Sequence, residues 1–151
     1  TGFAELAQAL LGLVRLQHFD IRQNELRATD LRILCEPMQG MVDLETLRIQ
    51  GNDFSSDPAH VWQCLANLSK VRTLDLSGNR MFSVRGQPWK YEMKNAFRRM
   101  RSLETLFLDG NQIPPEELFD IMEYLGHLGE RTPISLKLIQ LRGVVPARGD
   151  T

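Results

Sequence analysis

Apolar residues recur along this chain in one fixed pattern. Four segments carry apolar side chains at their first, fourth, sixth and eleventh positions and an asparagine at the ninth. Alternation of apolar and polar residues around the fourth to sixth positions is typical of a half-buried strand, so the pattern predicts one strand in each segment. The segments are LQHFDIRQNEL (16–26), LETLRIQGNDF (44–54), VRTLDLSGNRM (71–81) and LETLFLDGNQI (103–113).

The residues between these segments predict helices. Apolar side chains stand ten, six and three positions before each segment, which is the i, i+4, i+7 spacing of one helix face. Two helix starts are marked: Asp57 is a suitable N-cap before Pro58, and PPEE at 114–117 places acidic residues at the positive end of a helix dipole. Pro37 lies well inside a predicted helix, so we expect a kink or a break there.

The repeated motif L-x-x-L-x-L-x-x-N-x-L, with a strand and a helix in each unit, resembles the leucine-rich repeat family. Units of 27 to 32 residues resemble its long, helix-bearing subclass, which includes ribonuclease inhibitors and Ran GTPase-activating proteins. The resemblance implies an α/β fold: a right-handed solenoid with a parallel concave sheet and convex helices. Strands stack closer together than helices do, which also places the strands on the inner curve. A column of asparagines is expected to satisfy backbone groups after each strand: Asn24, Asn52, Asn79 and Asn111.

The repeats also predict the organisation of the chain. Residues 1–15 fit the helix of a preceding repeat or an N-terminal cap, and residues 16–141 fit about four and a half repeat units. A fifth, decayed copy is seen in PISLKLIQL, with Leu141 where the asparagine would be. Residues 142–151 then form a tail.

The polar side of the predicted strands is the candidate binding surface. Strand alternation puts Phe107 and Ile139 on the concave face, where large apolar groups among polar neighbours indicate a contact site. The competing interpretation is that the tail or another repeat covers them. Arg48 is expected between two aspartates on adjacent strands, a pairing that would steady the sheet. The predicted partner-binding residues are Phe107, Ile139, Asp109, Lys137, Arg48 and Arg22, together with a loop at 80–89.

The predicted helix at 88–101 is basic and suggests a second kind of site. It could bind phosphate groups or an acidic partner, although acidic residues on the following helix are expected to answer part of its charge. The residues concerned are Lys90, Lys94, Arg98, Arg99 and Arg101. A structural subunit of a large ribonucleoprotein is therefore one alternative function. A regulator resembling GTPase-activating proteins is another, which the family resemblance permits without identifying any residue.

Composition narrows the remaining possibilities. With 18 basic and 19 acidic side chains the net charge is −1, which gives no overall attraction for nucleic acid or an anionic membrane. No apolar run reaches the roughly 20 residues of a membrane span.

His18, His60 and His127 lie in different repeats, and no catalytic motif occurs, so we expect no metal, cofactor, small-molecule substrate or enzymatic activity. Cys35 and Cys64 fall inside predicted helices, which argues against a disulfide-stapled secreted scaffold and favours a reducing compartment, the cytoplasm first. The sequence thus predicts a non-enzymatic protein-binding module or scaffold subunit.

Overall fold

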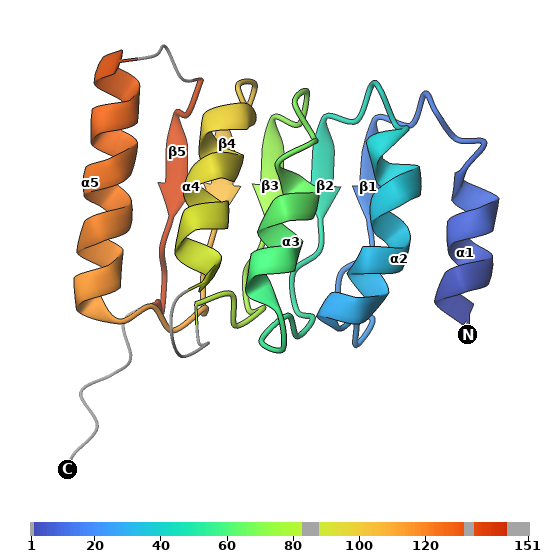
Figure 1. Cartoon of the computed structure of the whole chain (residues 1–151), viewed down its shortest axis with the longest axis horizontal. Coiled ribbons are helices and arrows are strands. Elements are labelled where there is room, and N and C mark those ends of the chain that lie inside the picture. The colour runs from blue at the N-terminus through green and yellow to red at the C-terminus, as the bar shows by residue number, and fades with distance from the viewer. Residues whose placement is uncertain (1, 83–87, 132–134, 145–151) are drawn as a thin grey trace.

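The computed structural model describes residues 2–82, 88–131 and 135–144. Within these ranges five helices alternate with five strands along the chain (Figure 1). The helices are α1 (Gly2–Leu10), α2 (Ala28–Gln39), α3 (Pro58–Leu65), α4 (Pro88–Arg99) and α5 (Pro115–Arg131). The strands are β1 (His18–Asp20), β2 (Thr46–Arg48), β3 (Thr73–Asp75), β4 (Thr105–Phe107) and β5 (Leu138–Gln140).

The strands form one parallel sheet in the order β1-β2-β3-β4-β5. The register of the first four strands follows the sequence motif, since the third residue of each motif pairs in one row. These residues are His18, Thr46, Thr73 and Thr105. The next residue of each strand, Leu47, Leu74 or Leu106, is completely buried. The predictions of an α/β fold and of a parallel sheet are confirmed.

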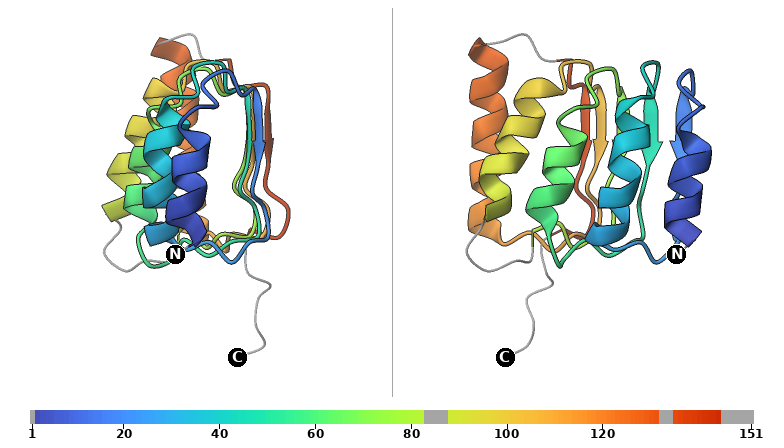
Figure 2. Two further views of the ribbon diagram at one scale, coloured as in Figure 1. Left: turned by 90° about the vertical axis from the view of Figure 1, so that its right-hand side faces the viewer. Right: turned by 45° about the vertical axis from the view of Figure 1, so that its right-hand side comes forward.

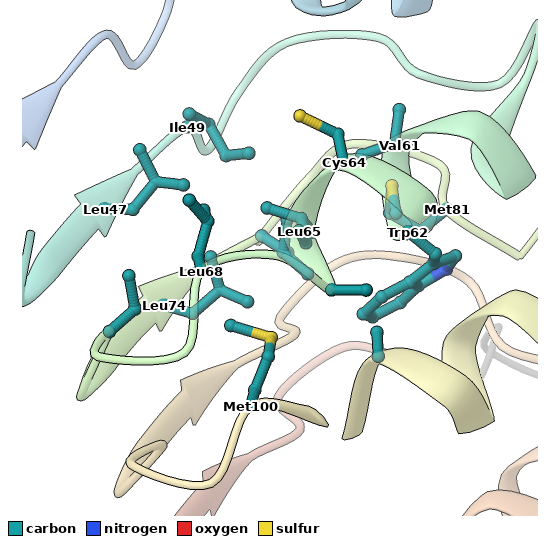
Figure 3. Close-up of a cluster of buried hydrophobic side chains, with 14 of the residues drawn as sticks. Leu47, Ile49, Val61, Trp62, Cys64, Leu65, Leu68, Leu74, Met81 and Met100 are labelled. Carbon is teal, nitrogen blue, oxygen red and sulfur yellow. The ribbon is translucent and has the colours of Figure 1, made fainter. Parts of the chain in front are cut away.

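The molecule has two layers (Figure 2). All five helices lie against one face of the sheet, and no helix covers the other face in the part of the chain that the structure describes. Leucines from the strands and apolar residues from the helices meet between the layers, as the cluster around Leu65 and Trp62 shows (Figure 3). This single core fixes the direction of every strand residue, since alternate side chains must point into it or away from it.

The predicted helix starts are present. The Asp57 side chain accepts a hydrogen bond from the His60 backbone N–H at 3.2 Å, and Pro58 is the first residue of α3. Pro115 begins α5, followed directly by Glu116 and Glu117 in the first turn. The break expected at Pro37 is wrong: α2 continues without interruption from Ala28 to Gln39, and the proline lies within its last turn.

The asparagine column predicted from the motif is also present. The Asn79 amide nitrogen donates to the carbonyl oxygens of Ile49 and Leu76 at 3.0 and 2.9 Å, and its oxygen accepts from the Asn52 N–H at 2.8 Å. Asn52 and Asn111 make the equivalent bonds one unit earlier and later. These three asparagines are buried, so each replaces the water that the turn carbonyls and N–H groups would otherwise need.

The fifth unit differs in register from the sequence prediction. Thr105 pairs with Leu138 and Leu106 with Ile139, which puts Val144 in the row of Asn111. The Ile113 N–H accordingly donates to the Val144 oxygen at 2.6 Å. The sequence prediction that Leu141 occupies the asparagine position is therefore wrong by three residues. An odd shift exchanges the two faces of a strand.

The two cysteines are bonded to each other. Cys35 on α2 and Cys64 on α3 have Cα atoms 5.8 Å apart and form a disulfide. Two cysteines on separate predicted helices come together because neighbouring helices pack side by side. The sequence favours a reducing compartment because no disulfide is expected between these two cysteines, and the bond removes that reason.

Candidate functional site

The candidate binding surface is the side of the sheet that none of the described helices covers. We call it the open sheet face and define it by the outward side chains of the five strands. Its members alternate with the buried core residues along each strand. They are His18, Asp20, Thr46, Arg48, Thr73, Asp75, Thr105, Phe107, Leu138 and Gln140.

The half of this face formed by β1 to β3 is charged. Arg48 pairs in register with Asp20 on one side and Asp75 on the other, as predicted. The Arg48 side chain nevertheless makes no hydrogen bond or ion pair with any residue that the structure describes, whereas Arg22 lies 3.3 Å from Asp20. A shallow cavity of about 290 Å³ opens here, and His18, Asp20, Thr46 and Arg48 contribute to its lining. Arg48 is therefore available to a partner.

The half formed by β4 and β5 carries the two large apolar side chains of this face, Phe107 and Leu138. Phe107 is partly exposed on this face and stands between Asp75 and Gln140 in the same row. Leu138 lies beside Thr105 on the next strand and is 48% exposed. Two large apolar groups thus stand on adjacent strands of an otherwise polar surface, which is the composition expected of a contact site.

Two of the predicted contact residues are placed elsewhere. Ile139 pairs with the buried Leu106 and packs against the core, so its predicted position on the exposed face is wrong. Lys137 lies just before β5 and outside the row of Phe107. Its Nζ is 3.5 Å from the Glu104 Oε1 atom. Both errors follow from the three-residue shift of the fifth unit. Leu138 is the exposed apolar residue that the sequence analysis missed.

Asp109 is engaged within the chain. Its carboxylate accepts hydrogen bonds from the Gln140 side chain at 2.5 Å and the Arg142 backbone N–H at 2.7 Å. Burial of Asp109 favours the protonated form, but these hydrogen bonds and the Arg142 guanidinium outweigh it and lower the pKa of Asp109. Asp109 consequently joins β4 to β5 and is less available to a partner than Arg48.

The basic helix is α4, and its charges are partly neutralised. The Lys90 Nζ lies 2.7 Å from Asp120 and 2.8 Å from Glu117 on α5, and these bonds raise the pKa of Lys90. Lys94 lies over the Tyr124 ring, 5.2 Å from its centroid. The prediction that the following helix answers part of the positive charge is confirmed.

The end of α4 keeps exposed cations. Arg99 donates to the Asn67 side chain at 3.1 Å and Arg98 to the Asn95 side chain at 3.2 Å, while the Arg101 side chain has no partner among the described residues. All three arginines are exposed. Lys90 differs from these arginines, because Glu117 and Asp120 hold it against α5.

The described ranges contain no group of three or more His, Cys, Asp or Glu side chains that could hold a metal ion. Nor do they contain a helix both long and apolar enough to cross a membrane.

Comparison with known proteins gives no assignment: no protein-family model matches this chain, and no curated protein matches it at a significant level.

Proposed function

We propose that this chain is a non-enzymatic protein-binding module of the leucine-rich repeat type, which binds a partner protein through the open sheet face. The observation that carries the proposal is the position of Phe107, a partly exposed aromatic side chain on a sheet face that none of the described helices covers. Exposure of an aromatic side chain to water is unfavourable in the free protein, and a partner that buries this side chain would gain the corresponding free energy.

The repeat-type architecture is part of the same proposal. Its supports are the motif shared by four segments, the shared register of their strands, and the asparagine bonds repeated in successive turns. Figure 1 adds that α1 and α5 stand outside the two edge strands, so the helix layer is wider than the strand layer. We infer from this a curved solenoid with the sheet on its inner, concave side.

The compartment remains a prediction. The sequence favours the cytoplasm, and the Cys35–Cys64 bond weighs against it because cytosolic thiols are kept reduced. The proposed loop contact at 80–89 also remains a prediction, since residues 83–87 lie outside the described ranges.

The test is site-specific cross-linking in cells that express the full chain. A photoreactive phenylalanine analogue at position 107 should form a covalent adduct with a partner protein. The same analogue at Phe119, which is 67% exposed on α5 in the helix layer, is the matched control and should give no such adduct.

The companion variants are Phe107→Ala and Leu138→Ser. Each should weaken binding of the cross-linked partner by about tenfold or more, because buried apolar anchors dominate interface energies. Neither should unfold the chain, since both side chains lie outside the core between the layers. Unchanged affinity in both variants, or equal cross-linking from positions 107 and 119, contradicts the proposal.

A further inference from the structure

The turn after α3 carries the one Asn-X-Ser/Thr sequence of the chain, Asn67-Leu68-Ser69. This sequence is the acceptor motif for N-linked glycosylation, provided that its middle residue is not proline. The other five asparagines have no serine or threonine two residues later. Because so short a motif also arises by chance, its meaning depends on where the three side chains lie.

The fold separates these side chains as the modification requires. Asn67 and Ser69 are exposed, while Leu68 between them is 4% exposed and points into the buried cluster (Figure 3). The buried leucine fixes the turn and so keeps the two polar residues on the surface. A bulky, polar glycan on Asn67 would therefore extend into solvent and leave the core unchanged.

Neighbouring units do not cover this turn. The residues that hold the position of Asn67 in the units before and after it, Gly40 and Arg99, are exposed as well. Asn67 thus has a described unit on each side and remains exposed between them. Its exposure consequently belongs to the turn itself, and not to an end of the described sheet.

The local contacts of Asn67 are compatible with a sugar on its nitrogen. Its side-chain oxygen accepts a hydrogen bond from Arg99 at 3.1 Å, and its nitrogen donates to the Gln63 carbonyl oxygen at 3.3 Å. A glycosylated amide keeps its oxygen and one N–H, so both bonds can persist. A cavity of about 280 Å³ beside the turn, with Asn67, Ser69 and Lys70 in its lining, gives the first sugar free space.

The disulfide is a second, independent observation. Cys64, which stands three residues before Asn67, is bonded to Cys35. Disulfides form and persist in the lumen of the endoplasmic reticulum and are rare in the cytosol. N-linked glycans are attached in that same lumen in eukaryotic cells. The acceptor motif and the disulfide depend on different residues and different chemistry, yet both indicate this compartment.

We propose that Asn67 is a site of N-linked glycosylation in a chain that passes through the eukaryotic secretory pathway. The donor is an oligosaccharide linked to a polyprenyl diphosphate. The Asn67 Nδ2 atom forms a bond to the first sugar carbon, the bond from that carbon to the diphosphate oxygen breaks, and the lipid diphosphate leaves as Nδ2 loses one proton. A chain modified in this way matures in the secretory pathway, and not in the cytoplasm that the sequence favours.

The experiment expresses the complete natural coding sequence in eukaryotic cells and isolates the protein with an antibody against this chain. Treatment with peptide-N-glycosidase should increase its electrophoretic mobility, because the enzyme removes N-linked glycans and converts the asparagine that carried them to aspartate. When this treatment is carried out in heavy-oxygen water, mass spectrometry should find the isotope label at position 67.

Two variants test the motif, and both should lose the glycan at this position completely. Asn67→Gln removes the acceptor, whereas Ser69→Ala keeps the asparagine and removes only the hydroxyl group that the transferase recognises. Ser69→Thr retains a hydroxyl and should keep the glycan. Because Asn67 and Ser69 are exposed, these variants should fold.

Asn95→Gln is the matched control. Asn95 also accepts a hydrogen bond from an arginine, Arg98 at 3.2 Å, but it belongs to no acceptor motif, so the glycan should be unchanged in this variant. An unmodified Asn67 in the protein isolated from cells overturns the proposal. So does a glycan at Asn67 that persists in Ser69→Ala. Binding through the open sheet face is tested separately by cross-linking at Phe107, and neither of these results bears on it.

Discussion

Asn79 satisfies three backbone groups with one side chain. Its amide bonds the Asn52 N–H and the oxygens of Ile49 and Leu76, and the residue is completely buried. Replacing it by alanine leaves these groups without partners in a region closed to water. We expect Asn79→Ala to lower the free energy of unfolding by about 2 to 5 kcal/mol, measured by urea denaturation.

Asn24→Ala is the matched control for this prediction. Asn24 belongs to the same column but is exposed and donates one hydrogen bond, to the Arg22 oxygen. Its replacement should cost no more than about 1 kcal/mol. Equal losses in the two variants would show that the column does not act through buried backbone groups.

The pKa of Asp109 predicts an acid-dependent part of the stability. Because the folded state lowers this pKa, the ionised carboxylate stabilises the fold fully above the ordinary value of 3.8. That contribution is lost as the pH falls through the lower folded value. Asp109→Asn should therefore be less stable than the natural chain at pH 7, and the difference should shrink near pH 3. A difference that is constant with pH would contradict this account.

At the scale of elements, the helices and the first four strands could be predicted because each unit repeats the same apolar spacing. The fifth strand could not, because Val144 stands where an asparagine would mark the register. One feature of the sequence, a glycine in the turn, does mark the register of the fifth strand. Gly51, Gly78 and Gly110 each precede a column asparagine and have positive φ angles of 65 to 70°, and Gly143 precedes Val144 with a φ of 63°. Glycine is favoured at such angles, so it marks the turn even where the asparagine is absent.

The disulfide ties two adjacent helices together and predicts sensitivity to reductant. Cys35 and Cys64 are 29 residues apart, and closing a loop of that length restricts the unfolded chain. Reduction should lower the free energy of unfolding by about 2 to 4 kcal/mol. Thermal unfolding with and without dithiothreitol measures this effect.

The control for the disulfide is the variant Cys35→Ala. Its melting temperature should be the same with and without reductant. This variant should resemble the reduced natural chain, because Cys35 is only partly buried and its side chain is small. If reductant leaves the natural chain unchanged, the bond contributes nothing to stability.

At the scale of the whole molecule, the described helices lie beside their neighbours in chain order, and so do the described strands. The candidate site reflects this layout. Phe107 and Arg48 could be placed from sequence because strand alternation within a regular unit decides their side of the sheet. The Asp109 bonds to Gln140 and Arg142, and the disulfide, could not, because they depend on how successive units meet.

Stability should accordingly vary along the molecule. The inward residue of β5, Ile139, is only partly buried, whereas its counterparts Leu47 and Leu74 are completely buried. Fewer buried apolar groups in the last unit mean a lower local cost of opening. Amides of α5 and β5 should therefore exchange faster than those of α3 and β3 in native-state hydrogen exchange.

A pair of core variants tests whether the ends open independently. Leu125 in α5 and Leu34 in α2 are both buried, and truncation of a buried leucine costs about 2 to 5 kcal/mol. Leu125→Ala should speed exchange in α5 and β5 and leave α2 and β2 nearly unchanged, because these described elements do not contact one another directly. Leu34→Ala should speed exchange around α2 without first opening the α5 end. Uniform acceleration throughout the chain in both variants would instead show that the five units unfold as one, since a fully cooperative fold spreads every loss to all its amides.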